Sequence, residues 1–470
     1  MNVENISVKD KEYYKKNFQS FFKRSDLFSL FVEQGLIRLA KPEGQVSFII
    51  PSIVLNNLSY QLLRDLFLDY NWLREVSYVG GNVFSDATVD TSILVFDKRG
   101  ADSINLRHAK DFFNAKERTV KSGYFKAFNN AISISEDSSD AVADKMFNSE
   151  FTTVDEHFAV FQGIVTGNNE TYLFSCDDEA ARKGIEISLL HPFVFGRDIG
   201  KWEMRTLEHK VLYIDKNFDI ESYPSTKEWL LSFKDTLSKR RECLKGTIPW
   251  YSLQWPRVKS ELDIQEKILI QRTRNESLKT RIVATLDKTG VYSAESIINV
   301  IPKNNLVSLY YFLAILNSRL LNYLFATKFL NLAVKGEYLK QVRFPNLSLY
   351  DQQPFIVLAD KMLSLHQQLQ EKRSKFLRRL NDNFEGVKVT TALQTFDQLD
   401  FKTFVAELKK QKIKLSLVQQ DEWEEYFNQY KAACNEISTQ ITTTDNEIDQ
   451  RVFDLYGLTP EEQQIVMGVI

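Results

Sequence analysis

The chain has 470 residues, of which 43% are hydrophobic and 26% charged, and its formal net charge is −2. A chain of this length can bury several cores, so two or three globular domains are expected. Its apolar runs are shorter than the roughly 18 residues of a membrane helix, and the polar start MNVENISVKDKEYYKK does not resemble a signal peptide. We expect a cytoplasmic protein outside the membrane, and the net charge neither supports nor excludes nucleic-acid binding.

The cysteines give no sign of a metal centre. Cys176, Cys243 and Cys434 lie far apart without a CxxC pair, and only five histidines are scattered through the chain. Structural zinc needs clustered thiol and imidazole ligands. We therefore expect free thiols and no bound metal.

The first hundred residues have the pattern of an α/β sheet. Apolar residues at helical spacing predict helices over 26–39, which ends at KPEG, and over 60–70. Apolar runs predict strands over 45–51, 75–80 and 91–96, with the loop GGNVFSDATVD between the last two. The order of these elements is that of the second half of a doubly wound sheet.

The strand over 45–51 requires more neighbours than this segment supplies. Its core, VSFII, is apolar on both faces, as in strands buried between layers of helices. Such a strand needs hydrogen-bonded neighbours on both edges, and the strands that follow can cover only one. We expect further strands to pair with the open edge, from a separate subunit or a missing portion of the same gene.

The pattern changes after residue 150. The polar stretch ISEDSSDAVADK predicts a connection, and the strand-like runs KVLYID, KILIQR and RIVATL then alternate with aromatic and basic loops. A helix is predicted over 306–325. Beyond Pro345, apolar stripes predict two long polar helices, around 355–379 and 422–442, that form a coiled-coil-like arm.

Ordered blocks of this sequence resemble the γ-type N6-adenine DNA methyltransferases with a TaqI-like C-terminal specificity domain. The first blocks are DLFSLFVEQGLIRLAKPEGQVSFIIPSIVL and LREVSYVGGNVFSDATVDTSILVFDK. HPFVFGRDIGKW, WYSLQWPRVK, KILIQRTR, SAESIINVIP and FLAILNSRLLNYLF then follow in the order of the specificity domain. The ending IDQRVFDLYGLTPEEQQIV is similar to the tails of large restriction-modification enzymes of this group. The resemblance covers nearly the whole chain.

This resemblance implies an α/β fold with four regions. Residues 1–110 would be the C-terminal half of a Rossmann-like methyltransferase domain, and 111–150 a connection. Residues 151–345 would be a mixed α+β target-recognition domain, and 346–470 a region of long C-terminal helices. The complete enzyme would bind double-stranded DNA and transfer a methyl group from S-adenosylmethionine to the adenine amino group, without a metal.

Two motifs of the family are absent from the printed sequence. It has no GxG after a strand, where the family binds S-adenosylmethionine, and no Asn-Pro-Pro-Tyr or Asp-Pro-Pro-Tyr. The resemblance assigns the orientation of the target amino group to that tetrapeptide. We expect no catalytic residue in this chain, no activity by itself, and a partner that supplies the N-terminal half. The alternatives are a non-enzymatic specificity subunit with a separate catalytic partner, and an inactive remnant of a broken gene.

Three residues of the first region correspond to family positions near the cofactor or the target base. The resemblance implies that Phe84, in NVFSDATV, stacks on the extruded adenine, because base flipping needs an aromatic platform. It implies that Phe31 lies against the cofactor adenine, with Phe28 as the neighbouring choice, and that Asp26 is near the same ligand. The alternatives are core positions for the phenylalanines and a helix cap for Asp26.

Aromatic and basic residues alternate in the target-recognition region. This mixture is expected where phosphates and base edges are bound, although it also describes a solvated basic face over core tryptophans. The candidate DNA-binding residues are Arg197, Trp250, Trp255, Arg257, Arg272, Arg274 and Lys335. Arg197 can instead pair with Asp198 and fix a turn. Short acidic matches to nuclease sites occur around Asp263 and Glu266, and we predict no nuclease activity from them.

Overall fold

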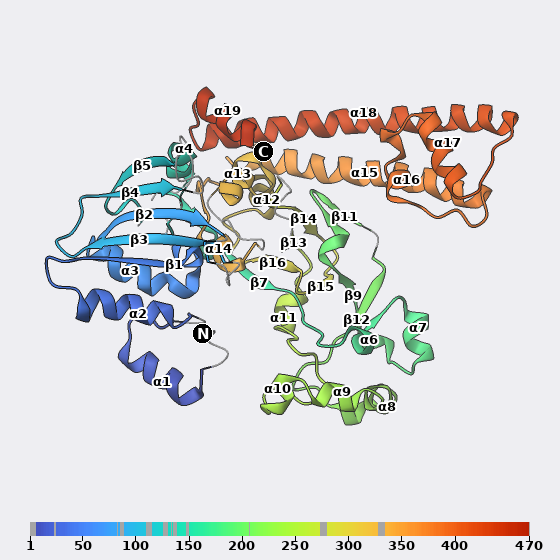
Figure 1. Cartoon of the computed structure of the whole chain (residues 1–470). Coiled ribbons are helices and arrows are strands. Elements are labelled where there is room, and N and C mark those ends of the chain that lie inside the picture. Colours follow the sequence, from blue (N-terminus) through green and yellow to red (C-terminus); the bar gives the residue numbers. More distant parts are fainter. Residues whose placement is uncertain are drawn as a thin grey trace. The chain divides into compact units, whose positions relative to one another are not determined.

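The computed structural model describes residues 6–22, 25–81, 83, 84, 89–109, 115–125, 130–132, 134, 139–146, 150–205, 207–272, 280–327 and 334–469 (Figure 1). The chain forms two compact units. Unit 1 comprises Met1–Phe151, Leu324–Leu330 and Leu458–Gly468, and unit 2 comprises Thr152–Tyr323, Asn331–Gly457 and Val469–Ile470. The first division of the chain thus lies one residue after the predicted start of the target-recognition region.

Unit 1 is built on a five-stranded sheet in the order β1-β3-β2-β4-β5. The strands are β1 Gln45–Pro51, β2 Leu73–Gly80, β3 Thr91–Asp97, β4 Ser103–His108 and β5 Lys116–Lys121. β3 runs antiparallel to β1 and β2, β2 is parallel to β4, and β5 is antiparallel to β4. The three strands predicted in this segment therefore form one continuous part of the sheet, with β1 at its edge.

Helices complete unit 1, and α3 Gln61–Asp69 packs against the sheet. Those described are α1 Val8–Asn17, α2 Phe28–Gln34, α3 Gln61–Asp69, α4 Ser139–Met146 and α19 Pro460–Val469. The core forms where α3 meets the sheet, since the rings of Phe67 and Phe96, both fully buried, lie 5.1 Å apart. From the other end of the chain, α19 is joined to α4 by Lys145, whose Nζ donates to Glu462 Oε2 at 2.6 Å.

The predicted helix over 26–39 forms from Phe28 to Leu39, but its last part is not an α-helix. The α-helix begins at Phe28, and from Gly35 to Leu39 the chain continues as a π-helix. The Ala40 N–H accordingly donates to the Gly35 carbonyl oxygen at 2.9 Å, five residues back. A Cβ added at Gly35 would lie 2.5 Å from the Phe48 ring, so this residue must be small for the helix to pack on β1.

Unit 2 contains two four-stranded sheets and two short strand pairs. The first sheet, in the order β14-β13-β16-β7, consists of β7 Phe158–Gln162, β13 Lys267–Gln271, β14 Ala284–Asp287 and β16 Ile297–Pro302. The second, in the order β15-β9-β12-β8, consists of β8 Leu173–Phe174, β9 Leu190–Val194, β12 His209–Leu212 and β15 Tyr292–Ser293. The pairs are β10 Ile199–Gly200 with β11 Glu203–Met204, and β6 Thr152–Thr153 with β17 Arg343–Phe344.

Short helices surround these sheets, and helices of 4 to 39 residues follow them in the chain. The short ones are α5 Val154–His157, α6 Asn169–Tyr172, α7 Asp177–Arg182, α8 Pro224–Leu231, α9 Lys234–Ser238, α10 Arg241–Leu244 and α11 Lys259–Leu262. The others are α12 Leu309–Asn317, α13 Arg319–Thr327, α14 Gly336–Gln341, α15 Gln353–Asn383, α16 Thr391–Gln394, α17 Phe401–Lys410 and α18 Leu417–Leu455.

The prediction of one helix over 306–325 is wrong, because the segment breaks at Ser318. This residue is extended, with ψ of 154°, and separates α12 from α13. Its hydroxyl donates to the Ile315 carbonyl oxygen at 2.7 Å and accepts from the Leu321 N–H at 3.2 Å. The side chain thus caps both helix ends and compensates for the backbone bonds lost at the break.

Two asparagines beside the break attach the helices to the edge of the first sheet. Asn317 donates to the Ala284 carbonyl oxygen at 3.0 Å and accepts from the Ala284 N–H at 3.2 Å. The Oδ1 of Asn322 accepts from the N–H groups of Arg281 and Ile282, both at 2.8 Å. The two amides therefore pair with backbone groups that a further strand would otherwise satisfy.

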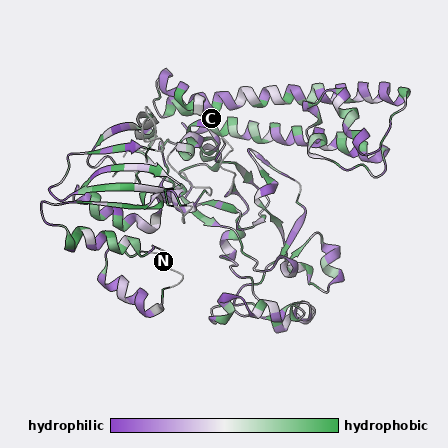
Figure 2. Ribbon diagram, in the orientation of Figure 1, coloured by the Kyte–Doolittle hydropathy of each residue, from purple (hydrophilic) through white to green (hydrophobic). Residues whose placement is uncertain are grey.

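The arm of unit 2 is formed by α15 and α18, which lie side by side, with α16 and α17 at the far end (Figure 1). Figure 2 shows hydrophobic and hydrophilic residues alternating along both long helices, as the predicted apolar stripes require. At the far end, the rings of Phe376 and Phe396 stack 3.7 Å apart in an aromatic core.

Acidic residues of α18 hold the arm to the sheets. The Asp445 carboxylate accepts two bonds from Lys201 Nζ at 2.8 Å, and Asp449 Oδ1 accepts from the Arg319 N–H at 2.7 Å. Asp449 is buried, and its Oδ2 lies 3.2 Å from Arg319 Nη1. Asp449 therefore supports the start of α13.

Asp449→Asn should flatten the pH dependence of folding stability. Burial raises the pKa of Asp449 to about 6, and Asp445 adds to this shift. The folded state then holds the proton more tightly than the unfolded chain, so the contribution of this carboxyl to stability is complete below about pH 4 and is lost as the pH rises through about 6. The expected loss is about 2–3 kcal/mol.

Denaturant unfolding at several pH values between about 4 and 7.5 measures this effect. Asp421→Asn, an exposed position on the same helix, is the matched control. Equal pH slopes for the wild type and Asp449→Asn would contradict this account of the buried carboxyl.

Candidate nucleic-acid interface

One end of the first sheet of unit 2 collects several of the predicted DNA-binding residues. In this antiparallel sheet, the ends of β7 and β13 lie beside the beginnings of β14 and β16. We call this end, with the residues Arg197, Trp255, Arg257, Arg272 and Lys335, the sheet-end cluster.

Backbone and side-chain hydrogen bonds tie together the segments that carry these residues. The Arg272 N–H donates to the Ser296 carbonyl oxygen, and the Arg272 carbonyl accepts from the Val334 N–H, each at 2.8 Å. The Gly196 N–H donates to Ser296 Oγ at 2.9 Å, and Gln271 Nε2 donates to the Gly196 carbonyl at 2.7 Å. Arg272 therefore belongs to one hydrogen-bonded network, and Arg197 and Lys335 directly follow two of its other members, Gly196 and Val334.

The Arg257 side chain is built into the fold at this end. Its Nε donates to the Gly163 carbonyl oxygen at 2.8 Å, and its Nη2 is buried without a hydrogen-bond partner among the described residues. Its backbone φ is +67°, which is uncommon for a residue with a side chain. Burial lowers the pKa of the Arg257 guanidinium, and the nearby Arg272 contributes to the shift, whereas Glu295 opposes it. Arg257 therefore has a structural role whatever else it contacts.

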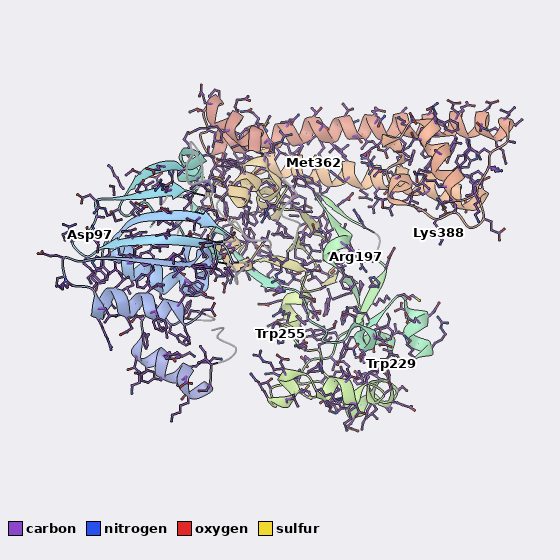
Figure 3. The ribbon with its side chains drawn as sticks, in the orientation of Figure 1. Asp97, Arg197, Trp229, Trp255, Met362 and Lys388 are labelled. Carbon is purple, nitrogen blue, oxygen red and sulfur yellow. The ribbon has the colours of Figure 1, made fainter. Side chains whose placement is uncertain are left out.

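The two tryptophans differ in their surroundings. Trp255 is 43% exposed, with the Arg257 guanidinium 5.5 Å from its ring centroid. Trp250 is half-buried against the core of the second sheet, edge-on to Tyr251. Figure 3 labels Trp255 and Arg197, both in unit 2. The position of Trp250 favours the alternative of a core tryptophan.

Arg197 combines exposure with partners on its own surface. Its side chain is 69% exposed, its Nε lies 3.7 Å from Asp198 Oδ1, and its Nη2 is 3.2 Å from His209 Nε2. Asp198 meanwhile accepts from the Phe195 N–H at 2.8 Å and so fixes the turn. The turn-setting alternative thus describes Asp198, and the guanidinium of Arg197 remains accessible.

Lys335 and Arg274 complete the predicted set. Lys335 precedes α14, and its Nζ lies 5.5 Å from the ring centroid of the buried Tyr338. Arg274 lies outside the described residues. The spacing of the sequence did not indicate Gly163 or Ser296, which join the segments of the cluster. A Cβ at Gly163 would lie 2.2 Å from the Ala294 carbonyl oxygen, so this residue must be glycine. In a sequence, such a close approach of two backbone segments is visible only as an isolated glycine.

In unit 1, both phenylalanines singled out in the sequence are exposed. Phe31 on α2 is 71% exposed and Phe84 is 47% exposed. Phe28, the alternative to Phe31, instead stacks on Tyr60 with ring centroids 5.0 Å apart. The core alternative is therefore wrong for Phe31 and for Phe84, although exposure alone assigns neither residue a ligand.

Asp26 is not the cap of α2. The N-cap is Leu27, without a side-chain bond, and the Tyr60 hydroxyl donates to Asp26 Oδ2 at 3.2 Å. Burial and the adjacent Asp26 carboxylate raise the pKa of the Tyr60 hydroxyl, which therefore stays protonated. This bond joins the start of α2 to the start of α3.

Other exposed apolar side chains lie on the elements at the β1 edge. Among the described residues of unit 1, β1 pairs only with β3. The exposed residues of β1 and of the segments before and after it are Phe31, Ile37, Leu39, Ile49 and Ile53. Soluble proteins seldom expose apolar residues beside an unpaired strand edge without a partner.

Two other classes of site find no support in the described part of the chain. No described helix is long and apolar enough to cross a membrane. Within the same residues, no three His, Cys, Asp or Glu side chains are grouped so that they could hold a metal ion. Cys176, Cys243 and Cys434 are free thiols.

Three protein families match successive segments of the chain, the first in unit 1 and the other two almost entirely in unit 2. Residues 1–84 match the Eco57I restriction-modification methylase family, and residues 191–343 match the TaqI-like C-terminal specificity domain. Residues 348–452, which include most of the arm, match a domain of unknown function. The chain thus carries a TaqI-like specificity domain and a segment that matches restriction-modification methylases, which confirms the resemblance to restriction-modification methyltransferases.

The chain spans about a third of the length of one known relative and about half of another. The type II restriction enzyme and methyltransferase RM.Eco57I of Escherichia coli is 22% identical over 365 residues, covering 68% of this chain and 36% of that protein. The type IIL restriction-modification enzyme MmeI, solved in complex with DNA, has a TM-score of 0.52 at 12% identity, covering 100% of this chain and 56% of that one. This likeness confirms the predicted mixed α/β fold.

Phe31→Ala and Phe84→Ala should leave folding stability nearly unchanged. Their rings are exposed, so truncation removes little buried area, and we expect a loss below about 1 kcal/mol. The matched control is Phe67→Ala, whose ring is fully buried and whose loss should cost about 3–5 kcal/mol. Denaturant unfolding of the three variants makes the comparison, and a Phe84→Ala loss as large as that of Phe67→Ala would contradict an exposed role.

Proposed function

We propose that this chain, which joins a TaqI-like specificity domain to part of a restriction-modification methylase domain, recognises double-stranded DNA for an adenine-N6 methyltransferase of a restriction-modification or phage-defence system. The sheet-end cluster carries this proposal, because aromatic and guanidinium groups from distant segments converge there. Such groups bind phosphates and base edges.

The β1 edge supports a second element of the proposal, that another polypeptide segment completes the catalytic sheet. β1 has one strand partner among the described residues, and Ile49 on this strand is 43% exposed. A strand added on the open side would pair its backbone groups and cover Ile49. The absence of Asn-Pro-Pro-Tyr from the sequence is consistent with that segment carrying the catalytic motif.

The cofactor of this enzyme class fits unit 1 only in part. S-adenosylmethionine supplies an electrophilic methyl group when it is bound. The exposed ring of Phe31 would lie against its adenine. Asp26, which accepts a hydrogen bond from the Tyr60 hydroxyl, lies two residues before α2, the helix that carries Phe31. No glycine-rich loop for its methionine end occurs in the sequence, so we assign that end to the added segment.

Phe84 would act on the target base. Its ring is exposed in the loop between β2 and β3, as a platform for an extruded adenine must be. The ring would replace part of the stacking that adenine loses on leaving the duplex, which is worth about 1–3 kcal/mol per base.

Reconstitution tests the division of labour. The purified chain alone should transfer no label from S-adenosylmethionine to DNA, and addition or fusion of a related N-terminal methyltransferase half should restore transfer to adenine. In the restored enzyme, Phe84→Trp should keep most activity because it retains a π-face, whereas Phe84→Leu should lose activity without losing stability.

Each alternative result has a definite meaning. Robust methylation by the chain alone would refute the need for an added segment. DNA binding without methylation in every combination would favour a non-enzymatic specificity subunit. Fluorescence of 2-aminopurine at the target position reports base flipping, and an unchanged signal in Phe84→Ala would remove Phe84 from the proposal.

DNA affinity should fall steeply with salt, since bound phosphates release counterions. Arg272→Gln and Lys335→Gln should each reduce the slope of log K against log salt by about 0.9, the value for one lost phosphate contact. Lys361→Gln, an exposed lysine of α15, is the control. Arg257 is left out because its substitution also removes the bond to Gly163. An unchanged slope in both variants would refute the assignment of phosphate contacts to this end of the sheet.

A further inference from the structure

The far end of the arm carries a group of lysines that the sheet-end cluster does not involve. Residues 384–416 connect α15 to α18 and are described throughout. Lys388, Lys409, Lys412 and Lys414 are exposed there, and we call them the basic tip. Figure 3 labels Lys388 at the end of the arm.

Backbone geometry brings these lysines together. The Lys388 N–H donates to Gln411 Oε1 at 2.7 Å, and Gln411 Nε2 donates back to the Lys388 carbonyl at 3.0 Å. The side chain of Gln411 thus holds the segment around Lys388 against the end of α17. Lys409, Lys412 and Lys414 lie within three residues of Gln411 on either side.

The turn after α17 holds Lys412 in a strained conformation. The Ile413 N–H donates to the Leu408 carbonyl at 3.1 Å and the Lys412 N–H to the Lys409 carbonyl at 2.9 Å, which is the Schellman arrangement. Lys412 occupies the left-handed position, with φ of +67°, where glycine is usual. Lys409 lies in the last turn of α17, where a lysine complements the helix dipole. The helix dipole does not explain why a lysine rather than a glycine occupies position 412.

The carboxylates of the tip are mostly engaged elsewhere. Asp397 is bonded by Arg373 at 2.7 and 2.8 Å, Asp400 caps α17, and Glu407 pairs with Lys410. None of the four lysines of the basic tip forms an ion pair with a described residue. Glu385 and Asp421 are the exposed carboxylates left in the segment 384–421. The segment 384–416 itself carries six lysines against four carboxylates, while the exposed Glu422, Glu424 and Glu425 follow on the first turns of α18.

The arm places this charge far from the sheets. Lys201, which binds Asp445, follows Arg197 of the sheet-end cluster by four residues. From Asp445 to Leu417, where α18 begins at the tip, 28 helical residues separate the two points, roughly 42 Å at 1.5 Å per residue. This distance equals roughly 12 base pairs of duplex DNA at about 3.4 Å each.

We propose that the basic tip binds the phosphate backbone of DNA outside the recognised sequence, as a second and sequence-independent contact of the specificity unit. This inference rests on the proposed function, because the duplex is the polyanion that the sheet-end cluster would already hold. Unpaired lysines suit phosphates, which need charge without base-edge geometry. The two exposed apolar residues nearby, Leu417 and Val418, offer too little area for a stable protein interface.

Duplex length separates the two contacts. We would measure the salt dependence of binding to mixed-sequence duplexes of about 10 and about 40 base pairs, since the shorter one, at roughly 34 Å, cannot span the arm. The wild type should show a slope steeper by about two to four units on the longer duplex. A variant with Lys388→Gln, Lys409→Gln, Lys412→Gln and Lys414→Gln should lose this difference and keep its affinity for the short duplex.

Two further variants separate charge from folding. The four corresponding Lys→Arg changes keep the charge and should keep the length dependence. Lys412→Gly relieves the left-handed backbone, so it should not lower the Tm, yet it should reduce the slope on the long duplex by about 0.9.

The outcomes distinguish this inference from the proposed function. If the wild type binds neither duplex, both fail. If it binds both with equal slopes, or if the Gln variant keeps the wild-type slope on the long duplex, only the contact at the tip is refuted. Sedimentation that shows a wild-type oligomer dissociated by the Gln changes would also refute it, because the lysines would then belong to a protein interface.

Discussion

The packing of unit 2 depends on a polar break between the two apolar helices α12 and α13. At Ser318 the helical backbone is interrupted, and one hydroxyl caps the ends on both sides. The break turns Asn317 and Asn322 toward the backbone of residues 281–284, which lies at the edge of the first sheet. It also directs the Arg319 N–H to Asp449 on the arm. Sheet, helices and arm thus share one hydrogen-bonded junction, whose buried groups would each be costly to leave unpaired.

A second hydrogen-bonded network explains how a cluster assembled from distant segments can keep its geometry. Arg197, Arg272 and Lys335 belong to three separate stretches of sequence, and each stretch is bonded to its neighbour through backbone groups. A rigid sheet end positions side chains better than free loops do. The Lys267–Asp287 ion pair, fully buried with 3.7 Å between its charged atoms, adds a constraint between β13 and β14. Because each charge would be buried alone without the other, this pair fixes which residues face each other.

Local pattern allowed part of this fold to be predicted from the sequence. β1, β2 and β3 lie within two residues of their predicted ranges, because short apolar runs between turn residues are a local signal. The break at Ser318 was not predicted, since its causes are partners far away in the sequence. Arg257 shows the same limit for the candidate site: its residue type suggested a DNA contact, but only the fold reveals its bond to Gly163. Phe31 was expected in the core by its helical spacing or at a ligand by resemblance, and only its exposure separates these readings.

The return of α19 to unit 1 has a consequence for biosynthesis. Lys145 and Glu462 are 317 positions apart. During translation, the ribosome must therefore synthesise nearly all of unit 2 before this ion pair can form. At about 5–20 residues per second, this wait lasts roughly 15–60 seconds. During that time the site that finally buries Val466 has no occupant, and the nascent unit 1 is open to chaperones and proteases. Closure of the first unit therefore follows synthesis of the second, and a chain that stopped before α19 would lack the side chains that complete this core.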